Sequence, residues 1–327
     1  MEKILDIENL NVEFKSDRGI VKAVNNVSFQ LNKGETIGLV GETGAGKTTT
    51  ALSIMNLVPG PHGKIKSGEI KFEGEDLLKK NEKEMRKIRG GKISMIFQDP
   101  MTSLNPVVTV GDQIAEVIKL HSEKKSRSEI KTKAKQMLEL VGIPSSRYDD
   151  YPHQFSGGMK QRVVIAIALA CNPELLIADE PTTALDVTIQ AQVLELMAKL
   201  KKELKTSMIL ITHDLGVVAG ECDHVAIMYA GEIVEYGNLK DIYKETKHPY
   251  TIGLFRSIPN IDKKDDRLVP IPGLMPDPAN LPEGCYFAPR CSMKMPECEK
   301  NHPQPVEITP GHYCRCLKVQ KEAEKNE

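Results

Sequence analysis

The chain has 327 residues, with 44 basic and 45 acidic side chains and a formal net charge of −1. This length allows two domains, or one large domain with an appendage, and the balanced charge excludes a broadly basic nucleic-acid-binding surface. No stretch approaches the roughly 18 consecutive apolar residues of a membrane-spanning helix. Glu2, Lys3 and Asp6 interrupt the apolar run that a signal peptide needs, so we expect the chain not to be exported.

Short apolar runs alternate with helical patterns over the first 245 residues, which predicts an α/β fold around a largely parallel sheet. The expected strands are residues 36–40, 93–97, 175–178 and 208–211. Segment 225–234 instead predicts a hairpin that turns near Ala230 and Gly231. Because parallel sheets meet ligands at the carboxyl ends of their strands, the polar residues that follow these runs are candidate site residues.

Two helical patterns, at 110–120 and 129–141, predict a small helical insertion at about 99–160. The composition changes at Pro249, since 12 of the 20 prolines lie between Pro249 and Pro310. Proline lacks a backbone N–H group, so long helices and central strands are not expected in that region. Five of the seven cysteines lie there or beyond, which argues against a disordered tail.

Residues 41–48 read G-E-T-G-A-G-K-T and match the phosphate-loop pattern G-x-x-x-x-G-K-[ST]. Glycines let the backbone direct several N–H groups at phosphate oxygens, and a helix that opens near Lys47 adds its positive end. Lys47 is then placed to reach the β- and γ-phosphates, and the Thr48 hydroxyl to bind Mg²⁺. Because the loop follows an expected strand and opens an expected helix, the sequence predicts a nucleotide phosphate site.

The apolar run at 175–178 ends in Asp179 and Glu180. Asp179 is expected to hold Mg²⁺ through its coordinated water, and Glu180 to polarise the attacking water. Acidic residues also cap strand ends, so the pair alone would leave a structural interpretation equally open. Together with the phosphate loop it favours nucleotide hydrolysis.

With these motifs the sequence resembles the ATP-binding cassette ATPases of membrane transporters, over residues 1 to about 240. Four more motifs follow in the family's order. They are Phe97-Gln98-Asp99, similar to the Q-loop; residues 155–162, similar to the signature, with Phe155 and Met159 in place of the usual Leu and Gln; Ala184-Leu185-Asp186, similar to the D-loop; and Thr212-His213-Asp214, which matches the switch histidine. The resemblance implies a P-loop NTPase (RecA-like) parallel-sheet core with an antiparallel β subdomain and a helical subdomain.

The resemblance also assigns roles. Ser156, Gly157 and Gly158 would form a second anion site at a helix N-terminus, which closes over ATP held by another protomer in a head-to-tail dimer. Glu180, His213 and Gln98 would be catalytic, and Mg²⁺ would be held through Thr48, Gln98 and Asp179. Phe14 lies where the family stacks an aromatic on adenine, and a core phenylalanine is an equal alternative. The implied nucleotide contacts are Gly41, Glu42, Thr43, Gly44, Ala45, Gly46, Lys47, Thr48, Thr49, Asp179, Phe14, Ser156, Gly157, Gly158 and Asp186.

Residues 102–106 (TSLNP) and 248–251 (HPYT) resemble the ATPase subunits of oligopeptide and dipeptide importers. This implies a cassette at 1–245, an irregular Cys/Pro-rich extension at 246–327, and ATP hydrolysis that powers peptide import from the cytoplasmic face of the cell membrane. The implied partners are two permease subunits, a second ATPase subunit (paralogue or identical copy) and, indirectly, an extracytoplasmic peptide-binding protein. Another cargo such as nickel is the alternative; a soluble cassette acting on DNA or ribosomes is a remote one, and no nucleic-acid partner is expected.

The cysteines near the C-terminus resemble the cysteine-rich segment of the same importers. The resemblance selects Cys285, Cys291, Cys298 and Cys316, with the spacing C-x5-C-x6-C-x17-C, and leaves Cys314 spare. Disulfides are disfavoured in a cytoplasmic chain, and four thiolates suit zinc or an iron–sulfur cluster. Structural zinc favours closer pairs, and the resemblance also points to [4Fe-4S], so we expect that cluster, with zinc or empty thiols as alternatives.

Overall fold

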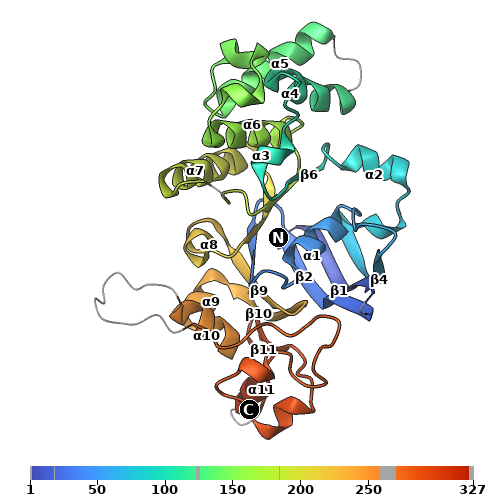
Figure 1. Cartoon of the computed structure of the whole chain (residues 1–327), viewed down its shortest axis with the longest axis vertical. Helices are drawn as coiled ribbons and strands as arrows, with labels where there is room; N and C mark the ends of the chain where they lie inside the picture. Colours follow the sequence, from blue (N-terminus) through green and yellow to red (C-terminus); the bar gives the residue numbers. More distant parts are fainter. Residues whose placement is uncertain (1, 18, 123–125, 184, 258–269, 324–327) are drawn as a thin grey trace. The chain divides into compact units, whose positions relative to one another are not determined.

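The computed structural model describes residues 2–17, 19–122, 126–183, 185–257 and 270–323. The chain divides into two compact units (Figure 1). Unit 1 comprises Met1–Leu5, Leu31–Thr36 and Phe72–Thr212, and unit 2 comprises Asp6–Gln30, Ile37–Lys71 and His213–Glu327. The boundary expected near residue 245 lies within unit 2, and it stays a prediction.

Three strands of unit 1 form a parallel arrangement in the order β8-β7-β6. These strands are β6 (Ile93–Ile96), β7 (Leu175–Asp179) and β8 (Ser207–Thr212). Every residue of β7 and β8 is buried, which explains their unbroken apolar runs. The three strands expected in this part of the chain are therefore confirmed to within a residue or two at their ends.

Helices lie in the segment where the helical insertion was predicted, and the two long ones begin at side-chain caps. The Thr109 hydroxyl accepts a hydrogen bond from the N–H of Asp112 (3.2 Å) at the start of α4 (Val110–Leu120). Ser126 and Glu129 form a reciprocal capping box that opens α5 (Arg127–Leu140). Unit 1 also contains β5 (Glu75–Asp76), α2 (Glu82–Ile88), α3 (Pro100–Ser103), α6 (Gly157–Leu169) and α7 (Val187–Leu204).

In unit 2, the strands follow the order β11-β12-β10-β9-β3. Strand β3 (Thr36–Val40) pairs in parallel with β9 (His224–Tyr229), which forms an antiparallel hairpin with β10 (Glu232–Asn238). The hairpin turns at Ala230 and Gly231, as expected, and both adopt positive φ, 47° and 84°. Unit 2 also contains α1 (Lys47–Ile54), α8 (Leu215–Glu221), α9 (Leu239–Lys244), α10 (Pro249–Arg256), β11 (Val306–Thr309), β12 (His312–Cys314) and α11 (Leu317–Ala323).

A second sheet contains β2, β1 and β4 as neighbours in that order. The three strands are β1 (Lys3–Ser16), β2 (Gly19–Asn32) and β4 (Gly63–Phe72). Sequence patterning did not locate them individually, although β2 carries the signal: Val27, Phe29 and Leu31 are buried while the residues between them are exposed.

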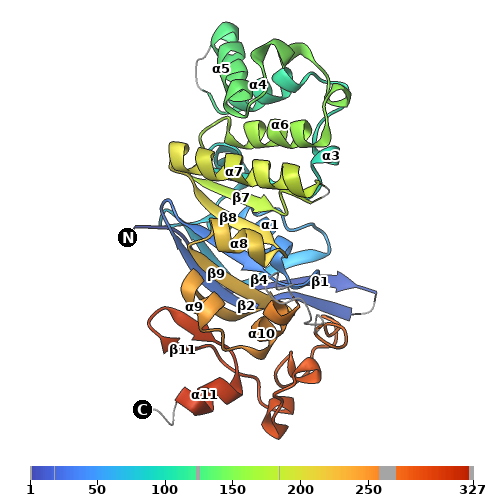
Figure 2. The same cartoon turned by 90° about the vertical axis from the view of Figure 1, so that its left-hand side faces the viewer.

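The C-terminal extension contains an interior strand, which corrects one expectation. Strand β12 lies between β11 and β10, with Cys314 opposite Glu235 (Figure 2 shows the extension in orange and red). The reason is local composition, because residues 311–316 contain no proline and keep every N–H group available for pairing.

Buried carboxylates of β10 fasten this extension to the sheet. Glu235 is fully buried and accepts hydrogen bonds from the N–H groups of Lys247 (2.7 Å) and His248 (3.1 Å). It also contacts Nε2 of His312 at 3.0 Å. Glu232 contacts Nε2 of His302 at 2.8 Å. The extension is thus held by buried polar pairs, and no sequence signal marked these pairs.

His248 gives the fold a specific acid sensitivity. Its Nδ1 accepts a hydrogen bond from the N–H of Tyr250 (3.1 Å), and burial lowers its pKa to about 4, with Glu235 only partly opposing this. The unfolded chain titrates near pH 6.5 and so binds more protons between pH 6.5 and 4, which means that stability falls as the pH falls through this window. His248→Asn keeps a hydrogen-bond acceptor at the start of the helix but has no titrating ring. Between pH 7 and 5, its free energy of unfolding should fall by about 2 kcal/mol less than that of the wild type. Denaturant unfolding at both pH values measures this, and identical losses would refute it.

Candidate functional site

The phosphate-loop pattern forms a tight turn between β3 and α1 in unit 2. A Cβ atom on Gly41 would lie 2.2 Å from the carbonyl oxygen of Met228, so no larger residue fits there. Gly46 caps α1 with a φ of 102°, a conformation that favours glycine. The expected strand, loop and helix therefore follow one another as the nucleotide motif requires.

Lys47 is held at the mouth of its own loop. Its Nζ donates hydrogen bonds to the carbonyl oxygens of Gly41 (2.7 Å) and Glu42 (3.0 Å), and the residue is 6% exposed. Thr43, Gly44 and Thr48, in contrast, are exposed. The cation is thus already placed within the loop, next to residues that are open to a ligand.

In unit 1, the end of β7 brings together residues that are distant in the sequence. Asp179 is the last residue of the strand and is 1% exposed. Oε2 of Glu180 accepts hydrogen bonds from Nε2 of Gln98 (3.1 Å) and from the Thr183 hydroxyl (3.0 Å). Gln98 and Glu180, both predicted to be catalytic, are therefore neighbours, and Thr183 joins them without having been predicted.

Glu180 also has an unusual backbone conformation. Its φ is 47°, and its N–H donates a hydrogen bond to the carbonyl oxygen of Ile211 on β8 (2.9 Å). A left-handed conformation costs a residue with a side chain on the order of 1 kcal/mol, and such costs concentrate at functional sites. The strain aims the carboxylate toward Gln98 and Thr183.

The signature residues open helix α6, as expected. Ser156 is the exposed cap residue, and its hydroxyl accepts a hydrogen bond from the N–H of Met159 (3.4 Å). A Cβ atom on Gly158 would lie 2.5 Å from Cγ2 of Ile189, so α6 and α7 pack closely at this point. Asp186 caps α7 by accepting a hydrogen bond from the N–H of Ile189 (3.0 Å), and Ala184 lies outside the described residues.

Two candidates in unit 2 lie at strand ends. His213 is exposed and directly follows β8. Phe14 lies near the end of β1 and is half-buried, and its ring edge is 2.6 Å from the position a Cβ atom would take on Gly63. Phe14 is thus neither a fully buried core residue nor a free surface ring, which leaves both earlier interpretations open.

The four selected cysteines lie in one neighbourhood of the extension. The N–H of Cys285 donates a hydrogen bond to the carbonyl oxygen of Cys298 (2.8 Å), and the thiols of Cys285, Cys291, Cys298 and Cys316 interact electrostatically with one another. Burial raises the pKa of Cys285 to about 12. Within the described ranges, however, no three His, Cys, Asp or Glu side chains form a group that could hold a metal ion as they stand.

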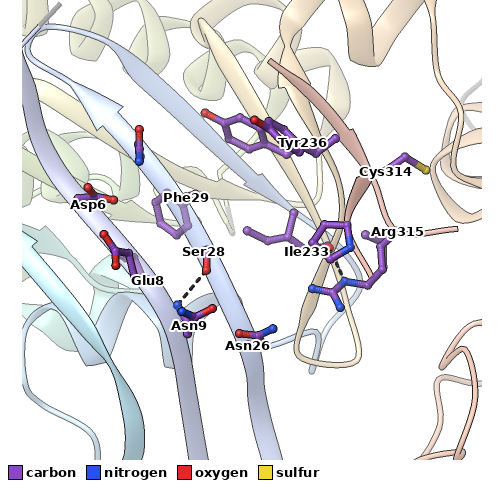
Figure 3. A pocket seen from close by; sticks show the side chains of 15 residues that line it. Asp6, Glu8, Asn9, Asn26, Ser28, Phe29, Ile233, Tyr236, Cys314 and Arg315 are labelled. Atoms are coloured by element: carbon purple, nitrogen blue, oxygen red, sulfur yellow. Dashed lines mark hydrogen bonds between the residues drawn. The ribbon is translucent and has the colours of Figure 1, made fainter. Parts of the chain in front are cut away.

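A pocket of about 410 Å³ lies elsewhere in unit 2 (Figure 3). Asp6 and Glu8 on β1 and Ser28 on β2 line one side, and Tyr236 and Arg315 lie on the other. Its described lining includes Cys314, the cysteine left out of the predicted four-cysteine site. It includes none of the predicted nucleotide contacts. It is therefore separate from the motifs that carry the predicted chemistry.

Comparison with known proteins gives the family. Residues 24–183 match the model described as ABC transporter, and residues 234–298 match the model described as oligopeptide/dipeptide transporter, C-terminal region. The chain is 51% identical over 326 residues to the dipeptide transport ATP-binding protein DppD of Bacillus subtilis (strain 168), covering 99% of this chain and 97% of the relative. The chain belongs to the ABC transporter family. It is thus an ATPase, as its motifs predicted.

Further similarities agree with this assignment. The oligopeptide transport ATP-binding protein OppD of the same organism is 52% identical over 328 residues, covering 99% of this chain and 91% of the relative. A solved dimeric ATP-binding cassette, in a post-hydrolysis state with ADP and phosphate bound, matches with 28% identity and a TM-score of 0.65, covering 72% of this chain and 98% of that one. The predicted P-loop NTPase fold is confirmed. None of the helices in the described part of the chain is long and apolar enough to cross a membrane.

Proposed function

We propose that the chain is the ATP-hydrolysing subunit of an importer of di- and oligopeptides. The observation that carries this is the hydrogen-bonded group of Gln98, Glu180 and Thr183 at the end of β7, in a chain that also holds a complete phosphate loop. The peptide cargo is taken from the names of the relatives and from the C-terminal family match.

In this proposal each residue has one task. The loop from Gly41 to Thr49 binds the phosphates, and Lys47 compensates their charge. Mg²⁺ would be held by Thr48, Gln98 and Asp179, whose oxygen atoms suit this ion, and it would neutralise charge that develops on the phosphates. Glu180 polarises the attacking water and His213 orients it.

A second ATPase subunit completes the site. Ser156, Gly157 and Gly158 open a 13-residue helix, and the first N–H groups of a helix have no carbonyl partner within it, which suits this end to the phosphates of ATP held by a partner subunit. Asp186, at the start of α7, would lie along the same contact, and Phe14 would stack on adenine. Closure of the pair would drive two permease subunits, with the cassette (1–245) at the cytoplasmic face of the membrane and an extracytoplasmic peptide-binding protein delivering the cargo.

The cargo is testable apart from the ATPase. In cells that lack their own peptide importer ATPase, the whole transporter containing this chain should restore growth on a peptide that supplies a required amino acid. Nickel accumulation without peptide-dependent growth would instead support the alternative cargo. A Glu180→Gln transporter serves as the inactive control.

We also propose that Cys285, Cys291, Cys298 and Cys316 hold a [4Fe-4S] cluster of structural function. Their electrostatic proximity and thiol-only donor set fit such a group or zinc, and its role would be to cross-link the extension. Since these side chains do not form a ready metal group as they stand, they would have to turn inward to bind it.

Assay of iron and acid-labile sulfide in anaerobically purified protein decides between the candidates. We expect about four iron and four sulfide per chain, with loss of both in Cys298→Ser. Cys222→Ser, a buried cysteine outside the extension, is the matched control and should change nothing. Stoichiometric zinc without iron would refute the iron–sulfur cluster and support a zinc site. The absence of both metals would show that the thiols bind no metal.

A further inference from the structure

Arg290, in the extension, reaches the phosphate loop. Its side chain is 6% exposed, and Nη1 forms an ion pair with Oε2 of Glu42 at 2.9 Å. Nη1 also donates to the Tyr229 hydroxyl (3.4 Å), and Nε donates to the carbonyl oxygen of Pro272 (2.9 Å). A buried guanidinium needs a counter-charge and several acceptors, and Glu42 is the carboxylate paired with it here.

The backbone of Glu42, like its side chain, is held by hydrogen bonds. Its carbonyl oxygen accepts from Nζ of Lys47 (3.0 Å), and its N–H donates to the Tyr250 hydroxyl (3.0 Å). The rings of Tyr250, Tyr229 and Phe287 pack on one another, with centroids 4.7 to 5.4 Å apart. The second residue of the phosphate loop is therefore fixed by the extension and by the aromatic residues beneath it.

The ion pair also changes the charge of the loop. The Glu42 side chain is 32% exposed and belongs to the loop that would bind the anionic phosphates. A bare carboxylate at this position would repel the nucleotide, and Arg290 cancels that charge. Because charges separated by less than about 10 Å are poorly screened, the pairing should be felt in nucleotide affinity.

Arg290 further ties down a neighbouring segment of the extension. It binds the carbonyl oxygen of Pro272, and three residues later Cε of Met275 lies 3.0 Å from the position a Cβ atom would take on Gly44 of the phosphate loop. Residue 290 directly precedes Cys291, so its position depends on how the cysteine segment folds. One side chain thus connects the cysteine segment, the segment around Met275 and the phosphate loop.

We propose that Arg290 is a positioning residue of the nucleotide site, through which the C-terminal extension sets the affinity of the phosphate loop for nucleotide. It does so mainly by cancelling the charge of Glu42, and its contacts with Glu42 and Pro272 also help to hold the loop. The inference rests on the proposed role of residues 41–48 in phosphate binding. It assigns to the extension an effect on the ATP site.

Titration of the full chain with Mg-ATP tests this. We expect Arg290→Gln to weaken binding on the order of tenfold and to raise the KM for ATP without changing kcat. Combining it with Glu42→Gln should bring the affinity back to within about threefold of the wild type, because the repelling charge is gone. A merely structural role predicts the opposite, a double variant at least as weak as Arg290→Gln.

Two further variants, at Arg315 and at Glu42, test the proposal independently. Arg315→Gln removes another buried arginine of the extension, which lies 3.6 Å from Glu232, and should leave ATP affinity unchanged. If Arg290→Gln does not fold, the single variant Glu42→Gln tests the proposal instead. In that variant the positive charge of Arg290 is no longer cancelled, so ATP should bind more tightly than to the wild type. Unchanged affinity in Arg290→Gln, or weaker binding in Glu42→Gln, overturns the proposal. Failure of the wild type to bind ATP would instead overturn the nucleotide site itself.

Discussion

Glu180→Gln is expected to lower ATP turnover at least about 100-fold while leaving ATP binding intact. The substitution keeps the shape of the side chain and an oxygen that can accept from Gln98 or Thr183, which now lie 3.1 and 3.0 Å from Oε2. It removes the negative charge that would polarise the attacking water. ATP should therefore bind, and the closed pair of subunits should accumulate because hydrolysis no longer opens it.

Single-turnover hydrolysis and light scattering with ATP measure both effects. Glu174→Gln is the matched control, since Glu174 directly precedes β7, at the opposite end of that strand, and forms an ion pair with Lys92 at 3.4 Å. That variant should hydrolyse ATP at the wild-type rate. Undiminished hydrolysis by Glu180→Gln would remove Glu180 from its proposed role.

Lys47→Ala is expected to weaken ATP binding on the order of 100-fold or more, a loss of about 3 kcal/mol. The ammonium group that would bind the phosphates disappears. The carbonyl oxygens of Gly41 and Glu42, which accept from Nζ at 2.7 and 3.0 Å, lose that donor as well. Both effects act on the same loop, so binding should suffer more than in any variant of the extension.

Isothermal titration with Mg-ATP measures the affinity. The matched control is Lys66→Ala on β4 of the same unit, where the lysine is exposed and 3.7 Å from Glu13, and it should bind as the wild type does. A Lys47→Ala protein that binds ATP with wild-type affinity would show that the loop does not serve as the phosphate site.

Much of the architecture could be predicted because local signals agreed with one another. The buried run of β3 and the glycines that follow it indicated a strand, a loop and a helix, and the structure contains them in that order. Caps such as Thr109 and Ser126 mark helices whose apolar spacing had already been recognised. Ordered motifs likewise led to the family that the comparisons show.

The rest depended on contacts between distant residues, which local patterns do not encode. Arg290 and Glu42 are 248 positions apart, and neither has a neighbour in the sequence that signals the pair. The three-residue strand β12 is too short for a periodic pattern and is defined by its partners. Nothing in the local sequence indicates that Glu235 is buried, because its partners, His312 and the N–H groups of Lys247 and His248, lie 12 or more positions away.

The most direct test of the account is ATP-driven uptake of a radiolabelled dipeptide into vesicles that carry the complete transporter with this chain. We expect uptake that requires ATP and falls to background when Glu180→Gln replaces the wild-type subunit. Equal uptake with both subunits, or ATP hydrolysis by the wild type without entry of the peptide, would contradict the proposal that this ATPase powers peptide import.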